Sequence, residues 1–386
     1  MQANNKSRFP NLLLKVKAQY SWDLMYLVLA VILLTRGVAS DLIYFLFVGL
    51  ICVFLFQRFI LSNHYAFFLI KVFLIVSIAF EFIIGKIPQE KKDAHEESFS
   101  ENFFISNAIY GHEMEANKKN VVHRFIVNGD TIYDVLYCTD NNACRVSCSE
   151  MNQNRIPNRH AFFVGCSFTF GHGADFEATI PALYEKYSSN TIAVNLGCNG
   201  YGPHQNLMDL HQNFDNIASK NNIPSKGFML YSFMDDHLND VYVDIESSEI
   251  KFNQNGGWIL TKKRNWRKFV IWLNNNSRAM QYFKVRFAHP ENDKFHKYFA
   301  DIISAMAKEY HRHYPENTFY VGYYPGEVRD TAWIKYCNQN IKFIKTRPPY
   351  DLNENYYDYH LQYDLHPTLK LNDYYVSYIF KNVQNN

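Results

Sequence analysis

The chain has 386 residues, of which 48% are hydrophobic and 17% aromatic, and its formal net charge is +2 at pH 7. This length leaves room for two or three structural units. No cluster of basic residues alternates with aromatic ones, which argues against nucleic acid as a partner.

The apolar excess is concentrated at the start of the chain. Three apolar runs occupy residues 24–34, 42–56 and 65–84. The last two approach the roughly 20 residues that cross a bilayer, and the first reaches that length when its flanks are included. We therefore expect three transmembrane helices within residues 21–86, after a cytoplasmic tail of residues 1–20.

Charge predicts the orientation of these spans. The first 20 residues carry basic side chains and no acidic ones; the basic residues are Lys6, Arg8, Lys15 and Lys17. Positively charged flanks stay in the cytoplasm. Three spans then place the rest of the chain outside, whereas two spans would keep it in the cytoplasm.

A charged linker of residues 87–102 is expected after the last span, followed by a β-rich lead-in of residues 103–155. Within the lead-in, residues 121–127 and 131–138 are predicted to be strands, because an Asn-Gly-Asp turn separates two runs rich in β-branched and aromatic residues. We expect the two strands to form a hairpin.

Three cysteines cluster at the end of this lead-in, Cys138, Cys144 and Cys148. In an oxidising compartment two of them could form a disulfide. No fourth ligand stands nearby at zinc-site spacing, so no metal is predicted there.

From residue 156 onward, strand-like and helix-like stretches alternate. The predicted strands are residues 160–164, 192–195, 227–232, 318–322 and 342–346. The predicted helices are residues 180–187, 205–219, 295–313 and 330–338. Such alternation predicts an α/β fold with a parallel sheet covered on both faces. Residues 240–294 interrupt it as a long insertion, for which a lid and a plain surface excursion are equally expected.

Two motifs far apart in the sequence carry the chemistry. One predicted strand leads into Gly-Cys-Ser-Phe-Thr-Phe-Gly at residues 165–171, which presents Ser167 in a glycine-rich turn. A serine among free backbone N–H groups supplies a nucleophile and oxyanion donors for acyl transfer. Near the other end, Asp364 and His366 form an Asp-x-His-Pro block. A histidine oriented by a carboxylate can take the proton of a serine hydroxyl.

The order of these blocks resembles the SGNH/GDSL hydrolase family, and most closely a bacterial membrane-anchored branch of it. Members of that branch carry the same Gly-Cys-Ser-Phe-Thr-Phe-Gly run. They follow it with Asn-x-Gly-x-x-Gly-Tyr-Gly-Pro-x-Gln and Phe-x-x-Asp-His, which here are residues 195–205 and 233–237. A lead-in like that from Tyr133 to Arg145 also precedes the serine there. The resemblance covers residues 132–386.

The resemblance implies a flavodoxin-like three-layer α/β/α domain over residues 156–386 and a catalytic triad without metal or cofactor. Ser167 would be the nucleophile, His366 the general base and then acid, and Asp364 the carboxylate that orients it. The backbone N–H groups of Ser167 and Gly200 would bind the oxyanion. Many relatives place the aspartate three residues before the histidine, where this chain has Tyr363.

The third oxyanion donor of the family is usually an asparagine, and the matching position here is Asp235. An ionised carboxylate would repel an oxyanion, so we expect His237 to donate instead, with Asn239 as the reserve. His172 and His204 stand beside the glycine-rich loops and are further candidates for the pocket.

Two alternatives for the catalytic groups stay open at this point. Asp358 and His360 repeat the Asp-x-His spacing without the following proline. Cys166, which precedes Ser167, could act as the nucleophile in its place.

The resemblance implies a membrane-anchored serine esterase that acts through a seryl ester, on O-acyl groups of cell-surface glycans. Its place would be the bacterial inner membrane, with the catalytic domain in the periplasm, and its partners the lipid bilayer and an acylated small molecule or glycan. An O-acyltransferase, a catalytically inactive binding module of the same fold and a transporter accessory are the alternatives. A Ser167–His366 contact would distinguish an enzyme from a binding module.

Overall fold

The computed structural model divides the chain into two compact units, one made of Met1–Lys91 with Lys268–Arg286 and the other of Lys92–Arg267 with Phe287–Asn386. We call the second the main unit. The described residues are 64–84, 93–149, 156–219, 223–243, 249–253, 257–261, 272, 276–277, 291–326, 330–349 and 356–384.

The first unit contains helix α3 (His64–Ile84), which coincides with the third predicted span. Among the helices of the described ranges, none combines the length and apolarity needed to cross a membrane. The other two predicted spans and the tail lie outside the described residues.

Nine strands of the main unit form one sheet, in the order β1-β4-β5-β6-β8-β7-β9-β12-β13. Their bounds are β1 His95–Phe99, β4 Val121–Val127, β5 Asp130–Thr139, β6 Arg145–Val146, β7 Arg159–Gly165, β8 Thr191–Gly197, β9 Gly227–Phe233, β12 Thr318–Tyr323 and β13 Ile341–Lys345. Two separate hairpins are β2 (Phe104–Asn107) with β3 (Gly111–Met114), and β10 (Glu249–Phe252) with β11 (Trp258–Thr261).

The five strands β8-β7-β9-β12-β13 pair in parallel. Numbered along the chain their order is 2-1-3-4-5, which is the flavodoxin-like arrangement. The predicted parallel α/β sheet is therefore confirmed. In this arrangement the loops that follow the carboxyl ends of neighbouring strands meet at one edge, so residues distant in sequence converge there.

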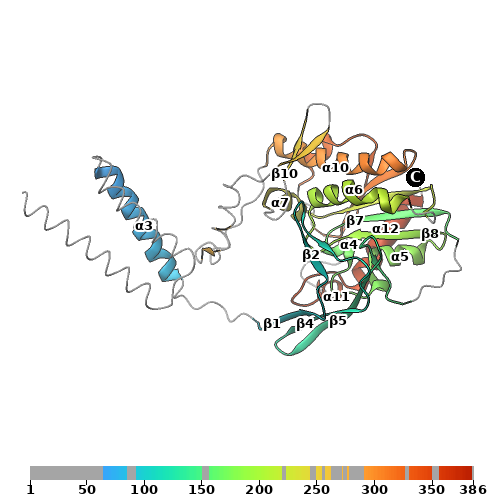
Figure 1. Ribbon diagram of the computed structural model, residues 1–386, viewed down its shortest axis with the longest axis horizontal. Coiled ribbons are helices and arrows are strands. Elements are labelled where there is room, and N and C mark those ends of the chain that lie inside the picture. Colours follow the sequence, from blue (N-terminus) through green and yellow to red (C-terminus); the bar gives the residue numbers. More distant parts are fainter. Residues whose placement is uncertain are drawn as a thin grey trace, which may run out of the picture. The chain divides into compact units, whose positions relative to one another are not determined.

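Helices cover both faces of these strands. Their bounds are α4 Ser167–Phe170, α5 Ile180–Tyr187, α6 Pro203–Ala218, α7 Asp236–Val243, α10 Asp293–His313, α11 Tyr356–Tyr359 and α12 Leu369–Gln384. Along β7, Phe162 and Val164 pack in the core with α6 and α10, whereas Ala161 and Phe163 pack with α5 and α12. This alternation follows from the pleat of a strand, and it produces the three expected layers (Figure 1).

Two short 3-10 helices complete the unit, η1 (Phe176–Ala178) and η2 (Ala332–Tyr336). The predicted α-helix at residues 330–338 is wrong, because only η2 forms there. Trp333 is fully buried in this turn, and its indole N–H donates to the carbonyl of Asp330.

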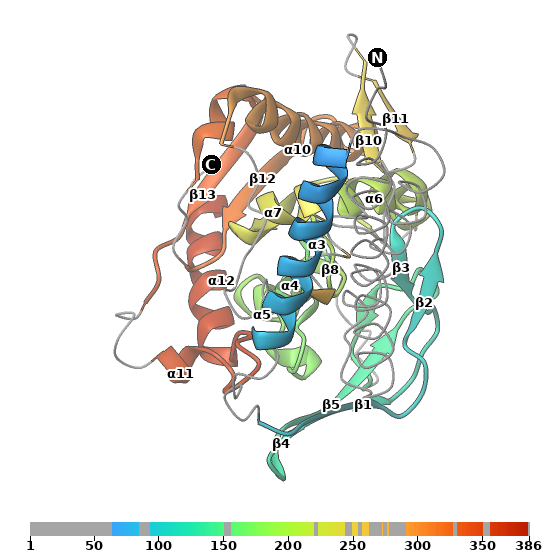
Figure 2. The same ribbon diagram turned by 90° about the vertical axis from the view of Figure 1, so that its left-hand side faces the viewer.

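The lead-in is an antiparallel extension of the same sheet. The predicted hairpin forms as β4 and β5, with Gly129 at φ +95° in the turn. Strand β6 then pairs with β5 on one side and with β8 on the other. The predicted boundary at residue 155, between the lead-in and the α/β domain, therefore separates strands that belong to one sheet. Figures 1 and 2 show β1, β4 and β5 side by side.

The predicted linker is also partly structured. Residues 95–99 form β1, which pairs antiparallel with β4 from His95↔Val127 to Phe99↔His123. Two charged residues of the predicted linker, Glu96 and Glu97, lie on this edge strand, where charges are common because they discourage pairing with other chains.

Candidate active site

Ser167 lies where the central strand β7 turns into the short helix α4. The backbone of α4 passes close to Gly197 of the neighbouring strand β8. A Cβ at this position would lie 2.4 Å from the backbone nitrogen of Phe170, so only glycine fits. The Asn195 amide donates to the carbonyl oxygens of Thr169 and Phe170, at 3.2 Å each. Together these contacts fix α4 against β8 and so fix the position of the serine.

His366 and Asp364 reach Ser167 from a loop near the other end of the sequence. His366 Nε2 is 2.8 Å from Ser167 Oγ, and its Nδ1 is 2.9 Å from Asp364 Oδ2. A carboxylate on Nδ1 holds the Nδ1–H tautomer, which leaves Nε2 to accept the hydrogen bond of the hydroxyl. The structure therefore brings together all three residues of the predicted triad.

The short Asp-x-His spacing is made possible by an unusual backbone. Tyr363 and Leu365, on either side of Asp364, have φ of +65° and +64°. Bulky residues rarely adopt this left-handed conformation, which costs about 1–2 kcal/mol each. Two such residues in alternation allow Asp364 and His366 to contact each other although only one residue separates them.

The charge state of Asp364 suits its position. Burial raises the pKa of this carboxyl, but the hydrogen bond from His366 and the charge of its ring outweigh that effect, and the pKa lies below its ordinary value. The carboxylate is therefore ionised at neutral pH and stabilises an imidazolium at His366.

A buried arginine holds the segment that follows Ser167. Arg145 of β6 is only 1% exposed, and its guanidinium donates to the carbonyl oxygens of Phe170, Gly171 and Ala174 at 2.6–2.7 Å. Burial lowers its pKa to about 10. Sequence reasoning gave Arg145 no role; a charged residue in a short strand beside apolar ones is the signal that could have found it.

Arg145 sits inside a disulfide loop. Cys138 and Cys148 are bonded, with their Cα atoms 5.3 Å apart, and Cys144 is buried outside the bridge. The sequence left open which of the three cysteines would pair. In the chain-entropy model, closing a loop of this size stabilises the fold by about 3 kcal/mol.

The two predicted oxyanion donors are backbone N–H groups with no protein acceptor among the described residues. The Ser167 N–H opens α4, where helical N–H groups lack partners inside the helix. Gly200 has φ +74°, and His112 Nε2 is 2.7 Å from the carbonyl oxygen of Asn199. Because a trans peptide is planar, the N–H of Gly200 points away from His112.

His237, the expected third donor, lies buried in the first turn of α7. Its Nδ1 accepts from the Met234 N–H at 3.3 Å and is 2.6 Å from the Tyr231 hydroxyl, so the ring proton is on Nε2. Burial lowers its pKa to about 3. Among the contacts of the described residues, none joins His237 to Ser167 or His366, and its oxyanion role stays a prediction.

The other residues of the Phe-x-x-Asp-His region lie near His237. Asp235 precedes α7 and its carbonyl accepts from the Leu238 N–H at 3.1 Å, while Asn239 is half-buried on the same helix. His204 is buried at the start of α6, close enough that its charge lowers the pKa of His237. These contacts place the three residues around α7.

His172 is placed directly beside the triad. Its ring centroid is 4.4 Å from that of His366, and its Nε2 is 4.0 Å from Asp364 Oδ2. The Asn199 amide is 2.6 Å from its Nδ1, and the Tyr133 hydroxyl is 2.9 Å from its Nε2. Burial and the neighbouring charge on His366 lower its pKa to about 3, so a neutral ring packs on the catalytic histidine.

The alternative nucleophile, Cys166, is protonated, and the alternative histidine, His360, has other partners. Burial raises the pKa of Cys166 to about 11, so it is a thiol at neutral pH and not the thiolate that attacks. His360 Nδ1 is 3.0 Å from the carbonyl oxygen of Leu365, and its ring stacks on Tyr356. Asp358 pairs with Lys370 at 3.3 Å. His360 therefore supports the loop that carries His366.

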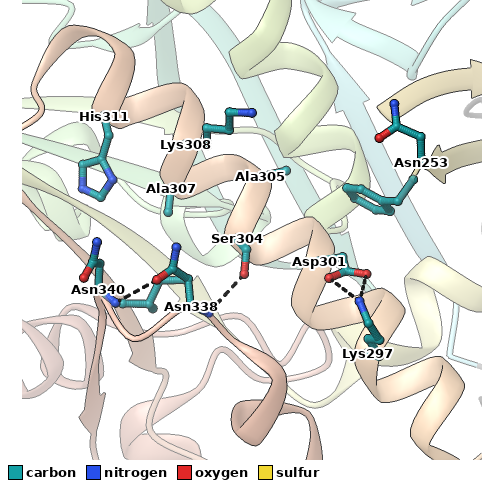
Figure 3. Close-up of a pocket in the computed structure, with 12 residues that line it drawn as sticks. Asn253, Lys297, Asp301, Ser304, Ala305, Ala307, Lys308, His311, Asn338 and Asn340 are labelled. Atoms are coloured by element: carbon teal, nitrogen blue, oxygen red, sulfur yellow. Dashed lines mark hydrogen bonds and ion pairs between the residues drawn. The ribbon is translucent and has the colours of Figure 1, made fainter. Parts of the chain in front are cut away.

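A cavity of about 410 Å³ lies at a different place, lined by α10, β10 and the segment that leads into β13 (Figure 3). An ion pair between Lys297 and Asp301 and a 3.4 Å hydrogen bond from the Asn338 N–H to Ser304 Oγ lie in its walls. The segment before β13 is at the amino edge of the parallel strands, whereas Ser167 follows the carboxyl end of β7. The cavity is therefore distinct from the triad.

No protein-family model matches the chain, and no curated protein matches it. Among solved structures, an acetyl xylan esterase from the rumen bacterium Butyrivibrio proteoclasticus is similar at 11% identity and TM-score 0.38, over 71% of this chain and 72% of that one. A family two carbohydrate esterase from Clostridium thermocellum in complex with cellohexaose shares 12% identity at TM-score 0.37, over 61% and 66%.

A putative lipolytic protein of the G-D-S-L family from Desulfitobacterium hafniense shares 13% identity at TM-score 0.29, over 57% of this chain and 98% of that one. These TM-scores are low.

We expect acid to destabilise the protein, because buried histidines with lowered pKa values resist protonation in the folded state. Burial lowers the pKa of His160 to about 4 and those of His172 and His237 to about 3. An unfolded chain binds protons at these groups near pH 6.5 and the folded chain does not, so stability falls as the pH drops below that value. Each of these histidines is expected to lower the free energy of unfolding by about 1.4 kcal/mol when the pH falls from 7.5 to 5.5.

Urea unfolding at the two pH values would measure this effect. In the variant His160→Gln the pH dependence should shrink by about 1.4 kcal/mol, because the contribution of this histidine is lost. A free energy of unfolding that stays constant between pH 7.5 and pH 5.5 would contradict the expectation.

Proposed function

We propose that the protein is a serine esterase that cleaves carboxylic esters through a seryl-ester intermediate. The observation that carries this proposal is the chain of two hydrogen bonds from Ser167 Oγ to His366 Nε2 and from His366 Nδ1 to Asp364, at 2.8 and 2.9 Å. Both distances are within the range that proton transfer requires. A binding module would not need this contact.

The groups present account for each step of ester cleavage. His366 Nε2 takes the hydroxyl proton as Ser167 Oγ bonds to the carbonyl carbon, and the N–H groups of Ser167 and Gly200 stabilise the oxyanion. The bond to the alcohol breaks, and the alcohol leaves with the proton held by His366. Water then attacks the seryl ester, aided by the same histidine, and releases the acid.

The proposed substrates are O-acyl groups of cell-surface glycans. Exposed aromatic and apolar side chains flank the triad, with Tyr363 43% and Leu365 48% exposed, and such surfaces suit the faces of sugar rings. Transfer to a sugar hydroxyl in place of water would make the same site an O-acyltransferase. Product analysis with and without an added glycan acceptor distinguishes the two outcomes.

Attachment to a bacterial inner membrane, with the active site in the periplasm, is part of the proposal. It is supported by the apolar runs and the basic tail in the sequence. The Cys138–Cys148 disulfide fits an oxidising compartment. Fractionation of cells that express the full chain, with protease added to intact spheroplasts, would test both points.

Labelling with a fluorophosphonate probe tests the chemistry without knowledge of the substrate. We expect the wild-type chain to be labelled and Ser167→Ala not to be, because the probe phosphonylates only an activated serine, with loss of fluoride. Ser106→Ala, on the hairpin strand β2, is the matched control and should be labelled like the wild type. A folded wild-type protein that resists the probe would refute the esterase proposal.

A further inference from the structure

One carboxylate and two histidines form a cluster beside the triad. Glu97 comes from β1, His123 from β4 and His172 from the turn after α4. Glu97 Oε1 is 2.8 Å from His123 Nε2 and 3.8 Å from His172 Nε2, and the three atoms lie within 4.8 Å of one another. Ligands about 2.0–2.2 Å from a tetrahedral zinc are separated from each other by about 3.3 Å. Small side-chain rotations would bring the cluster to that separation.

The Nδ1 atom of each histidine also has a hydrogen-bond partner, as in metal-binding histidines. His123 Nδ1 is 2.9 Å from the Tyr137 hydroxyl, and His172 Nδ1 is 2.6 Å from the side-chain amide of Asn199. Turning that amide by 180° presents its oxygen to Nδ1–H, since the two orientations have the same shape. Both rings then have the lone pair of Nε2 directed toward Glu97.

The surroundings suit a cation that arrives from solvent. His123 is fully buried and His172 is 8% exposed, whereas the Glu97 side chain is 48% exposed and gives access to the cluster. Asp364 adds a second carboxylate, with Oδ2 4.0 Å from His172 Nε2. Imidazole and carboxylate together are typical zinc ligands.

We propose that Glu97, His123 and His172 bind a zinc ion. Zinc binds Nε2 of a neutral His123, whose single ring proton then lies on Nδ1 and is donated to the Tyr137 hydroxyl. His172 Nε2 exchanges its hydrogen bond with the Tyr133 hydroxyl for the metal. Asp364 or a water molecule completes four-fold coordination.

Bound zinc would inhibit the triad, an effect that rests on the proposed esterase function. The ring of His172 is 4.4 Å from the ring of His366, so the metal adds positive charge next to the imidazolium that catalysis requires. The metal also competes with His366 for Asp364. Both effects slow attack by Ser167.

Zinc binding to the metal-free full chain tests the site directly. We would titrate Zn²⁺ in competition with a chromophoric chelator and expect one zinc per chain at micromolar or tighter affinity. Glu97→Gln should weaken binding about ten-fold or more. Glu96→Gln, the neighbour exposed on the same strand, is the matched control and should bind like the wild type.

His172→Asn, checked for folding by circular dichroism, provides a second test and should weaken binding as Glu97→Gln does. Absence of wild-type binding, or affinity unchanged in both variants, would overturn the proposal.

The rate of fluorophosphonate labelling tests the inhibition. Zinc should slow labelling of the wild type about ten-fold and have less effect on Glu97→Gln. Zinc that binds through these residues without changing the rate would overturn the inhibitory role and leave the site standing. A chain that binds zinc in this way but is never labelled would refute the esterase proposal alone.

Discussion

Replacing His366 with alanine is expected to lower kcat/KM for an activated acetyl ester by about 10⁴-fold or more. Without the imidazole, Ser167 has no base at 2.8 Å to accept its proton, and the water that hydrolyses the seryl ester has none either. This loss corresponds to about 5.4 kcal/mol of transition-state stabilisation. Steady-state hydrolysis of p-nitrophenyl acetate by the purified full chain would measure it.

The sharpest control for this result is a double variant. If Ser167 and His366 act as one unit, Ser167→Ala with His366→Ala should be no slower than either single variant. His211→Ala, whose half-exposed ring pairs with Glu309 at 3.0 Å, should keep the wild-type rate. Losses that multiply in the double variant would show that the two residues act independently and would contradict the triad.

Exchanging Asp364 for asparagine should lower kcat by about 10³- to 10⁴-fold at neutral pH. The change keeps the shape of the side chain but removes the charge that stabilises the imidazolium. It also allows the amide to stabilise the wrong tautomer of His366 through its N–H donors. Circular dichroism should show an unchanged fold.

The sequence supplies a matched control for this variant, because Asp358 stands in the same Asp-x-His spacing. Asp358→Asn alters an exposed carboxylate that pairs with Lys370, and the expected change in kcat is less than about two-fold. Equal losses in the two variants would show that the charge of Asp364 has no special role.

The parallel sheet and the triad could be predicted because both depend on local patterns. A buried run such as residues 161–164 indicates a central strand, and a strand that ends in Gly-x-Ser presents its serine at the edge of the sheet. The direct contact of Ser167 with His366 then follows from the geometry of parallel strands.

Glu97 and His123 could not be found near the triad in this way, because long-range packing places them there. Glu97 falls within the predicted charged linker, and it reaches His172 only because β1 pairs with β4. His123 offered one signal, since it occupies an inward position of β4 between Val121 and Phe125. A polar residue on the apolar face of a strand usually has a buried partner.

The contact between Ser167 and His366 joins positions 199 residues apart in the chain. Contacts of such high sequence separation form late in folding, because the entropy of closing the intervening loop must be overcome first. The loop with His366 is followed by α12, whose Tyr375 and Ile379 are buried against the sheet. Reactivity at Ser167 therefore arises only once this helix has docked. A fluorophosphonate label would count completely folded molecules, and the time course of its incorporation during refolding would report the last step of assembly.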